Sequence, residues 1–589
     1  MEKWFVTAKW ADFDEWAEKF KISPVLARIL RNRDLEDTNQ VQKFLYGTLE
    51  DSYSPWLLKD MDKAVELLLC AIKQQIFIRV IGDYDVDGIC SSYILTKGLQ
   101  MLGARVDIAI PHRIHDGYGL NDNLIQKAKE DGVEMIVTCD NGIAAAPQIA
   151  LAGQLGIQVI VTDHHEVPYV EENGKRREQL PPACAVIDPK QELCLYPFKN
   201  ICGGVVAYKL MLAMLEKWEN QSQEQTACRE EFLEFAAFAT VCDVMELKDE
   251  NRILVKEGLK RLKHTSNLGL QALMEVNGID PNHLSAYHLG FVLGPCLNAT
   301  GRLDTAKRGL ELLFAQTKVE AMSAARELKE LNDSRKNLTL QGVEKAEAYI
   351  EEHGMKQDKV LVIFLPEVHE SLAGIIAGRI REKYNHPVFV LTRSEEGVKG
   401  SGRSIEAYHM YEAMTQVNRF FTKYGGHKLA AGLSMREEDI EPLRNALNEA
   451  CSLTEEDFIP RVHIDVPMPL SYADEELAGQ LELLEPFGVG NPKPLFAQKE
   501  LVFVSATKMG ANKNVARFRV RTPEGLFLQL VYFGDLNRFG QFLRDKYGAD
   551  SEELLYAGRG EFPVSVVYQL GFNVYRGKRN MQYIMQYYC

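Results

Sequence analysis

The sequence lacks the features that mark secreted, zinc-binding and membrane-spanning proteins. Its eleven cysteines include no Cys-x-x-Cys pair, which disfavours a zinc ribbon and a thioredoxin-type motif. The first residues are charged from Glu2 onward, without the apolar core of a leader peptide. No run of 18 apolar residues occurs, so no membrane span is expected. Cys70, Cys139 and Cys242 lie in apolar runs, which predicts buried free thiols in a reducing, cytoplasmic setting.

Net positive charge and compositional bias are also missing. The 589 residues carry a formal charge of −15, which excludes a uniformly basic nucleic-acid-binding coat but not a local basic patch. Hydrophobic residues make up 46% and charged residues 26%, which indicates a folded globular protein rather than a disordered chain. At about 150 residues per domain, the length predicts roughly four domains.

Short apolar runs alternate with helical patterns between residues 76 and 310. The runs, rich in Ile and Val, are IFIRVIG, VDIAI, EMIVTC, IQVIVT and CAVI. This alternation predicts a parallel α/β sheet with both faces covered. Residues 318–353 are rich in helix formers and contain no Pro, which predicts a long connecting helix or helix pair. A second α/β unit begins with KVLVIF and continues to about residue 453.

The C-terminal part of the chain is β-rich and locally basic. Apolar runs separated by turn signals predict a small barrel or sandwich. Residues 501–589 contain 12 Lys and Arg against 7 Asp and Glu, a local charge of +5. Arg517, Arg519 and Arg521 recur with the two-residue period of a strand and therefore share one face. A second basic cluster near Tyr575 contains Arg576, Lys578 and Arg579. A basic, aromatic-bearing barrel suits binding of a single nucleic-acid strand.

Acidic clusters follow three of the predicted strands. They are Asp83-Tyr-Asp85-Val-Asp87-Gly88, Asp140-Asn-Gly142 and Asp163-His164-His165. Because ligands of such sheets bind beyond the carboxyl ends of the strands, we expect the three clusters to meet at one edge. So many carboxylates together require a counter-charge. Oxygen ligands combined with imidazole suit a pair of Mn²⁺ or Mg²⁺ ions better than zinc.

Other motifs share parts of this pattern. DYDVDG matches the start of an EF-hand calcium loop, but Ile94 stands at the twelfth position, where that loop needs Glu. The segment also follows a predicted strand rather than a helix. Asp85-Val-Asp87-Gly88 resembles an aspartyl-phosphate phosphatase box, but such boxes usually continue with Thr and this one continues with Ile89. Any one acidic cluster is compatible with an ordinary turn, whereas the three together favour a metal centre.

The ordered acidic motifs resemble those of the DHH phosphoesterase superfamily. GDYDVDG, TCDNG, DHH and the later Ala239-Thr-Val-Cys-Asp243 occur in the order of that superfamily. Over nearly its whole length the chain is similar to the RecJ branch, the bacterial single-strand-specific exonucleases. The motifs that carry this closer resemblance are PHR at 111–113, GYG at 117–119, PCLNATGR at 295–302, GSGRS at 400–404, GGH at 425–427 and LEPFGVGNP at 484–492.

The resemblance implies an α/β fold with a C-terminal OB-fold barrel. The expected parts are an N-terminal segment plus parallel-sheet DHH catalytic domain at 1–315, a connecting helix at 316–354, a DHH-associated substrate-binding domain at 355–453 and an OB-fold nucleic-acid-binding domain at 454–589.

The resemblance also implies a role for each residue of the acidic motifs. The expected metal ligands are Asp83, Asp85, Asp87, Asp140, His164 and Asp243. Asp140 is expected to bridge the two ions, and Asp163 to orient a neighbouring ligand without binding metal. The expected catalytic residues are Asp140, His164 and His165. His165 is expected to assist the leaving group or grip the phosphate; the alternative is a histidine that only supports the ligands.

The terminal phosphate of a strand needs cationic or N–H donors. The candidate substrate-binding residues are Arg113, Asn298, Arg302, Ser401, Arg403, Gly426 and His427. In the related family such residues form a pocket for the 5′ phosphate. The alternative for a lone Arg is a solvated surface residue, and for the glycine pair before His427 a tight turn.

Three positions depart from the family's pattern. Asp188 precedes Pro189 where Asn is expected, Glu246 stands where Pro is more usual, and Thr300 replaces a common Ala. None of these departures removes a metal ligand, although Glu246 and Thr300 are expected near the site.

The resemblance therefore implies a Mn²⁺- or Mg²⁺-dependent 5′→3′ exonuclease of single-stranded DNA that releases nucleoside 5′-monophosphates in DNA repair and recombination. We expect a monomer, with a single-strand-binding protein and a helicase as candidate partners. One alternative is a DHH phosphodiesterase of short oligonucleotides or cyclic dinucleotides, but those relatives are generally shorter and lack the basic tail. The other is an inactive single-strand-binding scaffold, which would have lost metal ligands.

Overall fold

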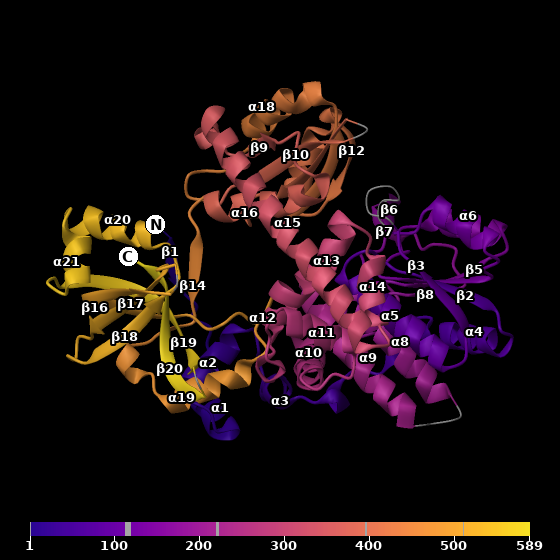
Figure 1. Ribbon diagram of the computed structural model, residues 1–589, viewed down its shortest axis with the longest axis horizontal. Coiled ribbons are helices and arrows are strands. Elements are labelled where there is room, and N and C mark those ends of the chain that lie inside the picture. Colours follow the sequence, from indigo (N-terminus) through magenta and orange to yellow (C-terminus); the bar gives the residue numbers. More distant parts are fainter. Residues whose placement is uncertain are drawn as a thin grey trace. The chain divides into compact units, whose positions relative to one another are not determined.

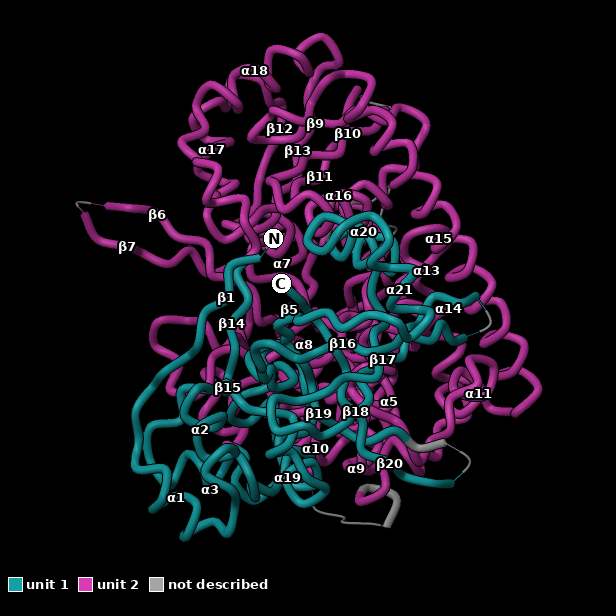
Figure 2. The backbone as a smooth tube through the Cα atoms, turned by 90° about the vertical axis from the view of Figure 1, so that its left-hand side faces the viewer, with its two compact units in different colours: residues 1–52, 246–253, 461–589 teal, residues 53–245, 254–460 magenta. Residues whose placement is uncertain are grey.

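The computed structural model divides the chain into two compact units (Figure 2). Unit 1 comprises residues 1–52, 246–253 and 461–589, and unit 2 comprises residues 53–245 and 254–460. The described residues are 2–111, 119–172, 174–218, 223–394, 397–510, 512–575 and 577–589.

Unit 2 contains a parallel sheet with the strand order β3-β2-β4-β5-β8 (Figure 1). Its strands are β2 (Phe77–Ile81), β3 (Arg105–Ala109), β4 (Met135–Cys139), β5 (Gln158–Thr162) and β8 (Ala185–Ile187). The helices of this part are α4 (Met61–Lys73), α5 (Val86–Met101), α6 (Asp122–Glu130), α7 (Ala146–Gln154) and α8 (Gly203–Lys217). The five Ile- and Val-rich runs thus form the predicted parallel strands. Helices α6 and α7 share an apolar core with one face of the sheet, and burial on both faces explains the continuous apolar runs.

A helical segment connects this sheet to the second part of unit 2. Its elements are α9 (Gln223–Cys242), α10 (Asp249–Leu262), α11 (Leu268–Val276), α12 (Ala286–His288), the π-helical turn η4 (Leu289–Leu293), α13 (Gly294–Leu303), α14 (Lys307–Leu313) and α15 (Lys318–Glu352). Helix α15 confirms the predicted connecting helix and is one continuous helix rather than a pair. It begins at Thr317, whose side chain accepts the Glu320 N–H in a capping box.

The second sheet of unit 2 is mixed, with the strand order β12-β13-β11-β10-β9. Its strands are β9 (Leu361–Phe364), β10 (Val388–Ser394), β11 (Gly397–Arg403), β12 (Phe421–Gly426) and β13 (Ala430–Met435). One face packs against α15 and α16 (Ala373–Tyr384). The other face packs against α17 (Met410–Gln416) and α18 (Ile440–Ala450). This is the second α/β unit that the sequence predicts.

Unit 1 contains a closed barrel in which β16, β17, β18, β20 and β19 pair in that order and β19 pairs back with β16. The barrel elements are β16 (Phe496–Met509), β17 (Val515–Arg521), β18 (Phe527–Tyr532), β19 (Phe562–Tyr575) and β20 (Lys578–Tyr588), with α20 (Leu536–Tyr547) and α21 (Ser551–Ala557) between β18 and β19. In β17 the side chains of Arg517 and Arg519 are exposed, whereas Phe518 and Val520 are buried. The predicted basic strand face is therefore confirmed.

The N-terminal residues belong to unit 1 and share its core. Strand β1 (Lys3–Val6) pairs in parallel with β14 (Arg461–Ile464). Helices α1 (Phe13–Phe20), α2 (Pro24–Asn32) and α3 (Thr38–Tyr46) contribute buried side chains to the core that the barrel residues form. Strand β15 (Val466–Pro467) and helix α19 (Glu475–Leu481) add to the same core.

All eleven cysteines are free thiols. Cys139 is buried as expected and Cys242 is partly buried. The expectation for Cys70 is wrong, because its position on the outer side of α4 leaves it exposed. Among the described residues, no helix is long and apolar enough to cross a membrane.

A two-stranded hairpin follows the DHH motif and projects from unit 2 (Figure 2). Its strands are β6 (Tyr169–Glu172) and β7 (Lys175–Glu178), which pair antiparallel. This hairpin could not be predicted from the sequence, because its strands are charged and exposed and lack the apolar alternation of a half-buried strand.

Candidate metal centre

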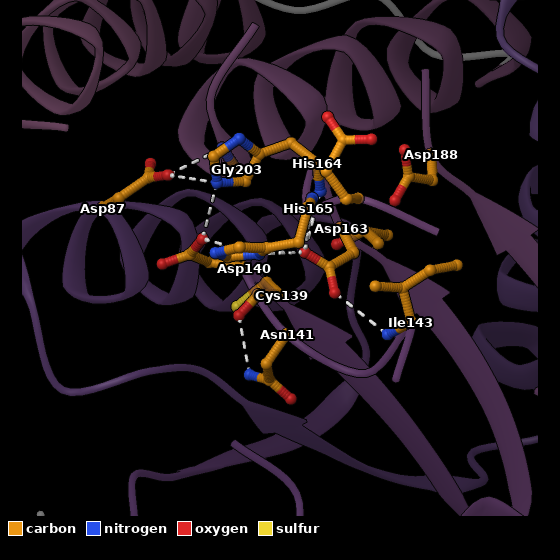
Figure 3. A network of polar contacts seen from close by, with 12 residues as sticks. Asp87, Cys139, Asp140, Asn141, Ile143, Asp163, His164, His165, Asp188 and Gly203 are labelled. Atoms are coloured by element: carbon orange, nitrogen blue, oxygen red, sulfur yellow. Dashed lines mark hydrogen bonds and ion pairs between the residues drawn. The ribbon is translucent and has the colours of Figure 1, made fainter. Parts of the chain in front are cut away.

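The three acidic clusters meet at the carboxyl edge of the parallel sheet (Figure 3). Asp83 and Asp85 follow β2, and the Asp85 carboxylate accepts the Gly88 N–H at 3.1 Å, which caps the start of α5. Asp140 follows β4 with a left-handed backbone (φ 60°), a conformation that Asp tolerates better than most residues. His164 and His165 follow β5. The sheet therefore places these side chains where the strand-end argument expects them.

His164 points its Nε2 atom at three carboxylates. It lies 3.0 Å from Asp140 Oδ1, 3.5 Å from Asp87 Oδ2 and 3.7 Å from Asp243 Oδ2. The side chain of Asp243, at the end of α9, is 27% exposed, whereas His164, Asp87 and Asp140 are almost fully buried. The site is therefore open to solvent at Asp243 and at His165, whose side chain is 44% exposed.

The possible ligand atoms form three groups that overlap through Asp140 and His164. One group is Asp83, Asp85 and Asp140; another is Asp87, His164 and Asp243; a third is Asp140, His164 and His165. Within each group the ligand atoms lie within 4.8 Å of one another. All six expected ligands fall into these groups. Asp140 is the carboxylate that joins the first group to His164, which is the position required of a bridging ligand.

The charges of these groups require cations. Burial raises the pKa of Asp140 well above its usual range, and the neighbouring Asp87 and Asp85 raise it further. Burial, together with Asp87 and Asp85, raises the pKa of Asp243 to about 8. Burial lowers the pKa of His164, so its ring is neutral at pH 7 and able to bind a metal. This donor set, carboxylate oxygens plus neutral imidazole, fits two Mn²⁺ or Mg²⁺ ions.

A pair of glycines that the sequence analysis did not single out supports the acidic cluster. Gly203 and Gly204 begin helix α8, and their N–H groups each donate to the Asp87 carboxylate at 2.7 Å. A Cβ on Gly203 would lie 2.7 Å from Asp140 Cβ, so only glycine allows this approach. The usable signal was the Gly-Gly pair directly before a long apolar helical run.

Asp163 holds His165 rather than joining a metal group. Its carboxylate accepts the Ile143 and His164 N–H groups and lies 2.7 Å from His165 Nδ1. Burial would lower the pKa of His165, but the hydrogen bond and charge of Asp163 outweigh it and raise the pKa to about 9. The ring of His165 is therefore protonated at pH 7 in the metal-free protein.

Asp188 adds a further buried carboxyl behind the site (Figure 3). It follows β8 and is fully buried; one oxygen accepts the Lys190 N–H at 2.7 Å, and Oδ2 has no hydrogen-bond partner among the described residues. Burial and the charge of Asp163 raise its pKa to about 8. Of the other two departures, Thr300 is buried and donates to Leu297 O within its helix, and Glu246 pairs with Lys248 in unit 1.

Two candidate phosphate-binding arginines, Arg302 and Arg403, lie beside α16 and the residues that precede it. Arg302 Nη1 donates to Ser371 O at 2.6 Å, and Ser371 Oγ donates back to Arg302 O at 3.1 Å. Ser401 and Arg403 share one face of β11, and a Cβ on Gly374 would lie 3.0 Å from Arg403 Nη2 and 3.5 Å from Ser401 Oγ. Both side chains of β11 are thus at the N-terminus of α16.

Arg403 is partly buried and has no acidic partner among the described residues. Its Nη1 donates to Gly402 O, and burial and the nearby Arg381 charge lower its pKa. A partly desolvated guanidinium at a helix N-terminus has the charge and the donors that an anion site requires.

The remaining candidates occupy two further places. Asn298 Oδ1 accepts the Val86 N–H at 3.2 Å and so holds α13 against the start of α5. Gly426 and His427 form the turn between β12 and β13, where His427 N donates to Ala430 O at 2.8 Å. The geometry of that turn agrees with the alternative of a tight turn, although strand pairing places it next to β11. Arg113 lies outside the described residues.

Models of three known domain families match consecutive parts of the chain. The model of the DHH family, N-terminal domain, matches residues 77–240, the DHHA1 domain matches residues 357–453 and the RecJ OB domain matches residues 464–587. The chain is therefore a DHH-family protein with a DHH-associated domain and an OB-fold, as the site and the two sheets indicate.

Relatives that match over nearly the whole chain identify its family more specifically. The chain is 33% identical to the "Single-stranded-DNA-specific exonuclease RecJ" of Salmonella typhimurium, with 97% of both chains covered, and 32% identical to that of Escherichia coli, with 98% of this chain and 97% of the relative covered. It belongs to the RecJ family. The Bacillus subtilis relative is 35% identical over 86% of this chain, which spans 62% of that protein's length.

A solved structure of the family has the same fold. The crystal structure of RecJ in complex with Mn²⁺ from Thermus thermophilus superposes with a TM-score of 0.81 at 27% identity, covering all of this chain and 79% of that one.

Proposed function

We propose that this chain is a metal-dependent exonuclease that degrades single-stranded DNA from its 5′ end and releases nucleoside 5′-monophosphates. The observation that carries the proposal is the pair of ligand groups joined through Asp140. Membership of a family whose relatives are named single-stranded-DNA-specific exonucleases supports it. The 5′ polarity and the products rest on the family resemblance together with the candidate phosphate pocket.

The proposed metal ligands are Asp83, Asp85, Asp87, Asp140, His164 and Asp243. Bound Mn²⁺ or Mg²⁺ ions supply a water nucleophile at neutral pH and stabilise the charge of an in-line displacement at phosphorus. Asp87 is fixed for this role by the N–H groups of Gly203 and Gly204. Asp163 fixes the ring of His165 through Nδ1, and its charge keeps that ring protonated. His165 then donates a proton to the leaving oxygen or binds the phosphate.

The terminal phosphate of the strand is assigned to the corner between β11 and α16. Arg403 supplies a guanidinium that no carboxylate of the described part of the chain neutralises, Ser401 supplies a hydroxyl and the helix N-terminus supplies N–H dipoles. Arg302, bonded to Ser371, joins this corner to α13 and thereby to the loop of Asp83 and Asp85. An end-binding pocket and a metal centre within one unit would explain why a terminus is preferred over internal phosphates. Asn298, Gly426, His427 and Arg113 are kept as secondary candidates.

The basic strand face of the barrel is assigned to the nucleic-acid chain beyond the active site. Arg517 and Arg519 are exposed on β17, and Arg519 lies 4.5 Å from the ring centroid of the half-exposed Phe527. A cation beside an exposed ring suits phosphates and unpaired bases together.

Neither alternative function is favoured by an observation on this chain. A basic OB-fold barrel exceeds what a phosphodiesterase of dinucleotides needs, and an inactive scaffold would not keep every ligand of the metal centre. We also propose the sequence limits 1–315, 316–354, 355–453 and 454–589 for the four parts of the chain, with residues 1–52 and 246–253 packed in unit 1. We further propose a monomer, a cytoplasmic location consistent with eleven free thiols, and a single-strand-binding protein and a helicase as partners.

The test is a digestion assay with Mn²⁺ and end-labelled strands of DNA and RNA, long and short. The proposal expects mononucleotides to appear first from the 5′ end of single-stranded DNA and no digestion in the presence of a chelator. Release from the 3′ end would overturn the polarity, and activity on dinucleotides alone would favour the phosphodiesterase.

A further inference from the structure

Two aromatic side chains are exposed on the helical segment that borders the metal centre. Tyr287 is 62% and Phe291 70% exposed, and their rings stack on each other with centroids 5.1 Å apart and an interplanar angle of 25°. Phe291 follows Tyr287 by four positions, so both rings lie on one side of α12 and η4. Large aromatic side chains gain stability from burial, so a stacked pair left in water indicates a surface that binds a partner.

The position of this aromatic pair connects it to the metal centre. Cys242 Sγ donates to Leu289 O at 3.5 Å, and a Cβ on Gly294 would lie only 2.4 Å from Cys242 Sγ. The π-helical turn that carries Phe291 is therefore packed tightly against the residue that precedes Asp243. Val244, which follows Asp243, is itself 66% exposed. The exposed apolar surface thus lies beside the opening of the site at Asp243.

The same helix continues from the aromatic pair to the loop of Asp83 and Asp85. Asn298 accepts the Val86 N–H at 3.2 Å, and a Cβ on Gly301 would lie 2.6 Å from Tyr84 O. With about 1.5 Å of rise per residue, Phe291 lies roughly 10 Å along the helix from Asn298. Because Asn298 contacts the start of the helix that follows Asp83 and Asp85, we expect the bases next to a terminal nucleotide at the metal centre to come within reach of the aromatic pair.

We propose that Tyr287 and Phe291 form a stacking platform for unpaired bases next to the scissile phosphate, and that this platform contributes to the preference for single strands. The inference rests on the proposed function and names the part of the substrate that this surface binds. Uncharged rings suit the faces of bases rather than phosphates, and stacking is tolerant of sequence because every base has a π-face. In a duplex the bases are already stacked and paired, so they cannot use the platform without strand separation.

The experiment compares two 5′-phosphorylated substrates with the full-length protein and Mn²⁺. One is an oligothymidylate of 12 nucleotides; the other has the same phosphates but tetrahydrofuran abasic residues in place of nucleotides 2–5. Removal of a stacking ring costs about 5- to 150-fold in binding of a base. The variant with both Tyr287→Ala and Phe291→Ala is therefore expected to lose about 10- to 100-fold in kcat/KM on the normal strand, mainly through KM. On the abasic strand it should lose less than about 2-fold.

Matched variants separate stacking from other effects. Phe291→Tyr keeps the ring and should retain activity, whereas Phe291→Leu keeps an apolar side chain of similar size and should not. Trp10→Ala removes another exposed ring, 82% exposed in unit 1, and should leave the ratio of the two substrates unchanged. Thermal melting of each variant tests for misfolding, which is not expected of such exposed positions.

The outcomes distinguish the inference from the proposed function. If the unaltered protein fails to digest the normal strand, the proposed function itself is wrong. If it digests that strand but the double variant loses the same factor in kcat/KM on both substrates, or loses activity on neither, the platform is overturned. Unchanged activity on both substrates would instead favour a protein partner for the aromatic pair. Selective loss on the base-bearing strand supports the platform, and a smaller single-strand preference of the variant over a blunt duplex supports its role in specificity.

Discussion

Replacement of Arg403 by alanine gives a direct test of how this protein would recognise a strand end. The guanidinium is partly buried at the N-terminus of α16, beside Gly374, and has no carboxylate partner among the described residues. A terminal 5′ phosphate carries more negative charge than an internal phosphodiester, so this cation should favour the terminus. A charge-assisted hydrogen bond contributes about 1.5–3 kcal/mol, which corresponds to roughly 10- to 150-fold. The low exposure of Arg403 places the expected effect toward the upper part of this range.

The assay measures kcat/KM on two strands that differ only in a 5′ phosphate or a 5′ hydroxyl. Arg403→Ala should lose about 100-fold on the phosphorylated strand and clearly less on the other. Arg403→Lys should recover only part of this loss, because a point charge does not reproduce the planar fork of Arg. The matched control is Arg393→Ala on the neighbouring strand β10, where the exposed Arg393 pairs with Glu437 instead of facing α16.

Equal losses on the two strands would refute the end-pocket assignment for Arg403 while leaving the metal centre untouched. Arg302 is a less clean test of the same idea. Its Nη1 atom donates to Ser371 O, so Arg302→Ala also removes a contact between α13 and the residues before α16. We therefore expect Arg302→Ala to reduce activity on both strands, with the larger loss on the phosphorylated one.

Four further predictions follow from other residues. Asp140→Asn should lower activity by several orders of magnitude yet raise the melting temperature of the metal-free protein, because carboxylate repulsion is relieved; retention of a tenth of the activity would contradict the bridging role. Asp188→Asn should raise the free energy of unfolding of the metal-free protein by about 2–4 kcal/mol at pH 7 and leave it unchanged at pH 4, as measured by melting in chelator. The reason is that the unaltered protein is fully stable below the unfolded-state pKa of Asp188 and loses stability as the pH rises through the folded-state pKa of about 8, whereas Asn does not titrate. Arg517→Ser with Arg519→Ser should reduce the slope of log K against log salt for single-strand binding by about 1.4, and an unchanged slope would remove this strand face from the interface. Arg252→Met should destabilise unit 1 by about 3 kcal/mol or more in denaturant unfolding, because several buried carbonyls lose their donor.

Much of the fold and of the metal centre could be predicted because both depend on short-range patterns. A parallel strand buried on both faces is a continuous apolar run, and the residues directly after it lie at one edge of the sheet. Asp83, Asp140 and His164 therefore come together from their positions alone. In β17 the two-residue period likewise assigned Arg517 and Phe518 to opposite faces.

Features that depend on pairing across long stretches of sequence could not be predicted. The hydrogen bonds from Gly203 and Gly204 to Asp87 join residues more than a hundred positions apart, and no local pattern indicates them. Trp16 and Phe20 of α1 belong to the same core as the barrel residues. Removal of residues 461–589 would therefore expose this N-terminal core, so substitutions on the face of β17 are a better test of strand binding than truncation.

Arg252 shows most clearly why sequence alone was insufficient. A charged residue near the start of a helix suggests a solvated surface position, yet its side chain is only 1% exposed. Its guanidinium donates to Phe44 O, Leu484 O and Glu485 O at 2.8 Å each and lies 3.9 Å from the ring centroid of Phe44. Five N–H donors in a fixed plane can satisfy several carbonyls at once, which a lysine could not do. Burial lowers its pKa to about 9, so this cation stays charged at neutral pH and ties three distant segments of unit 1 together only nine residues after Asp243.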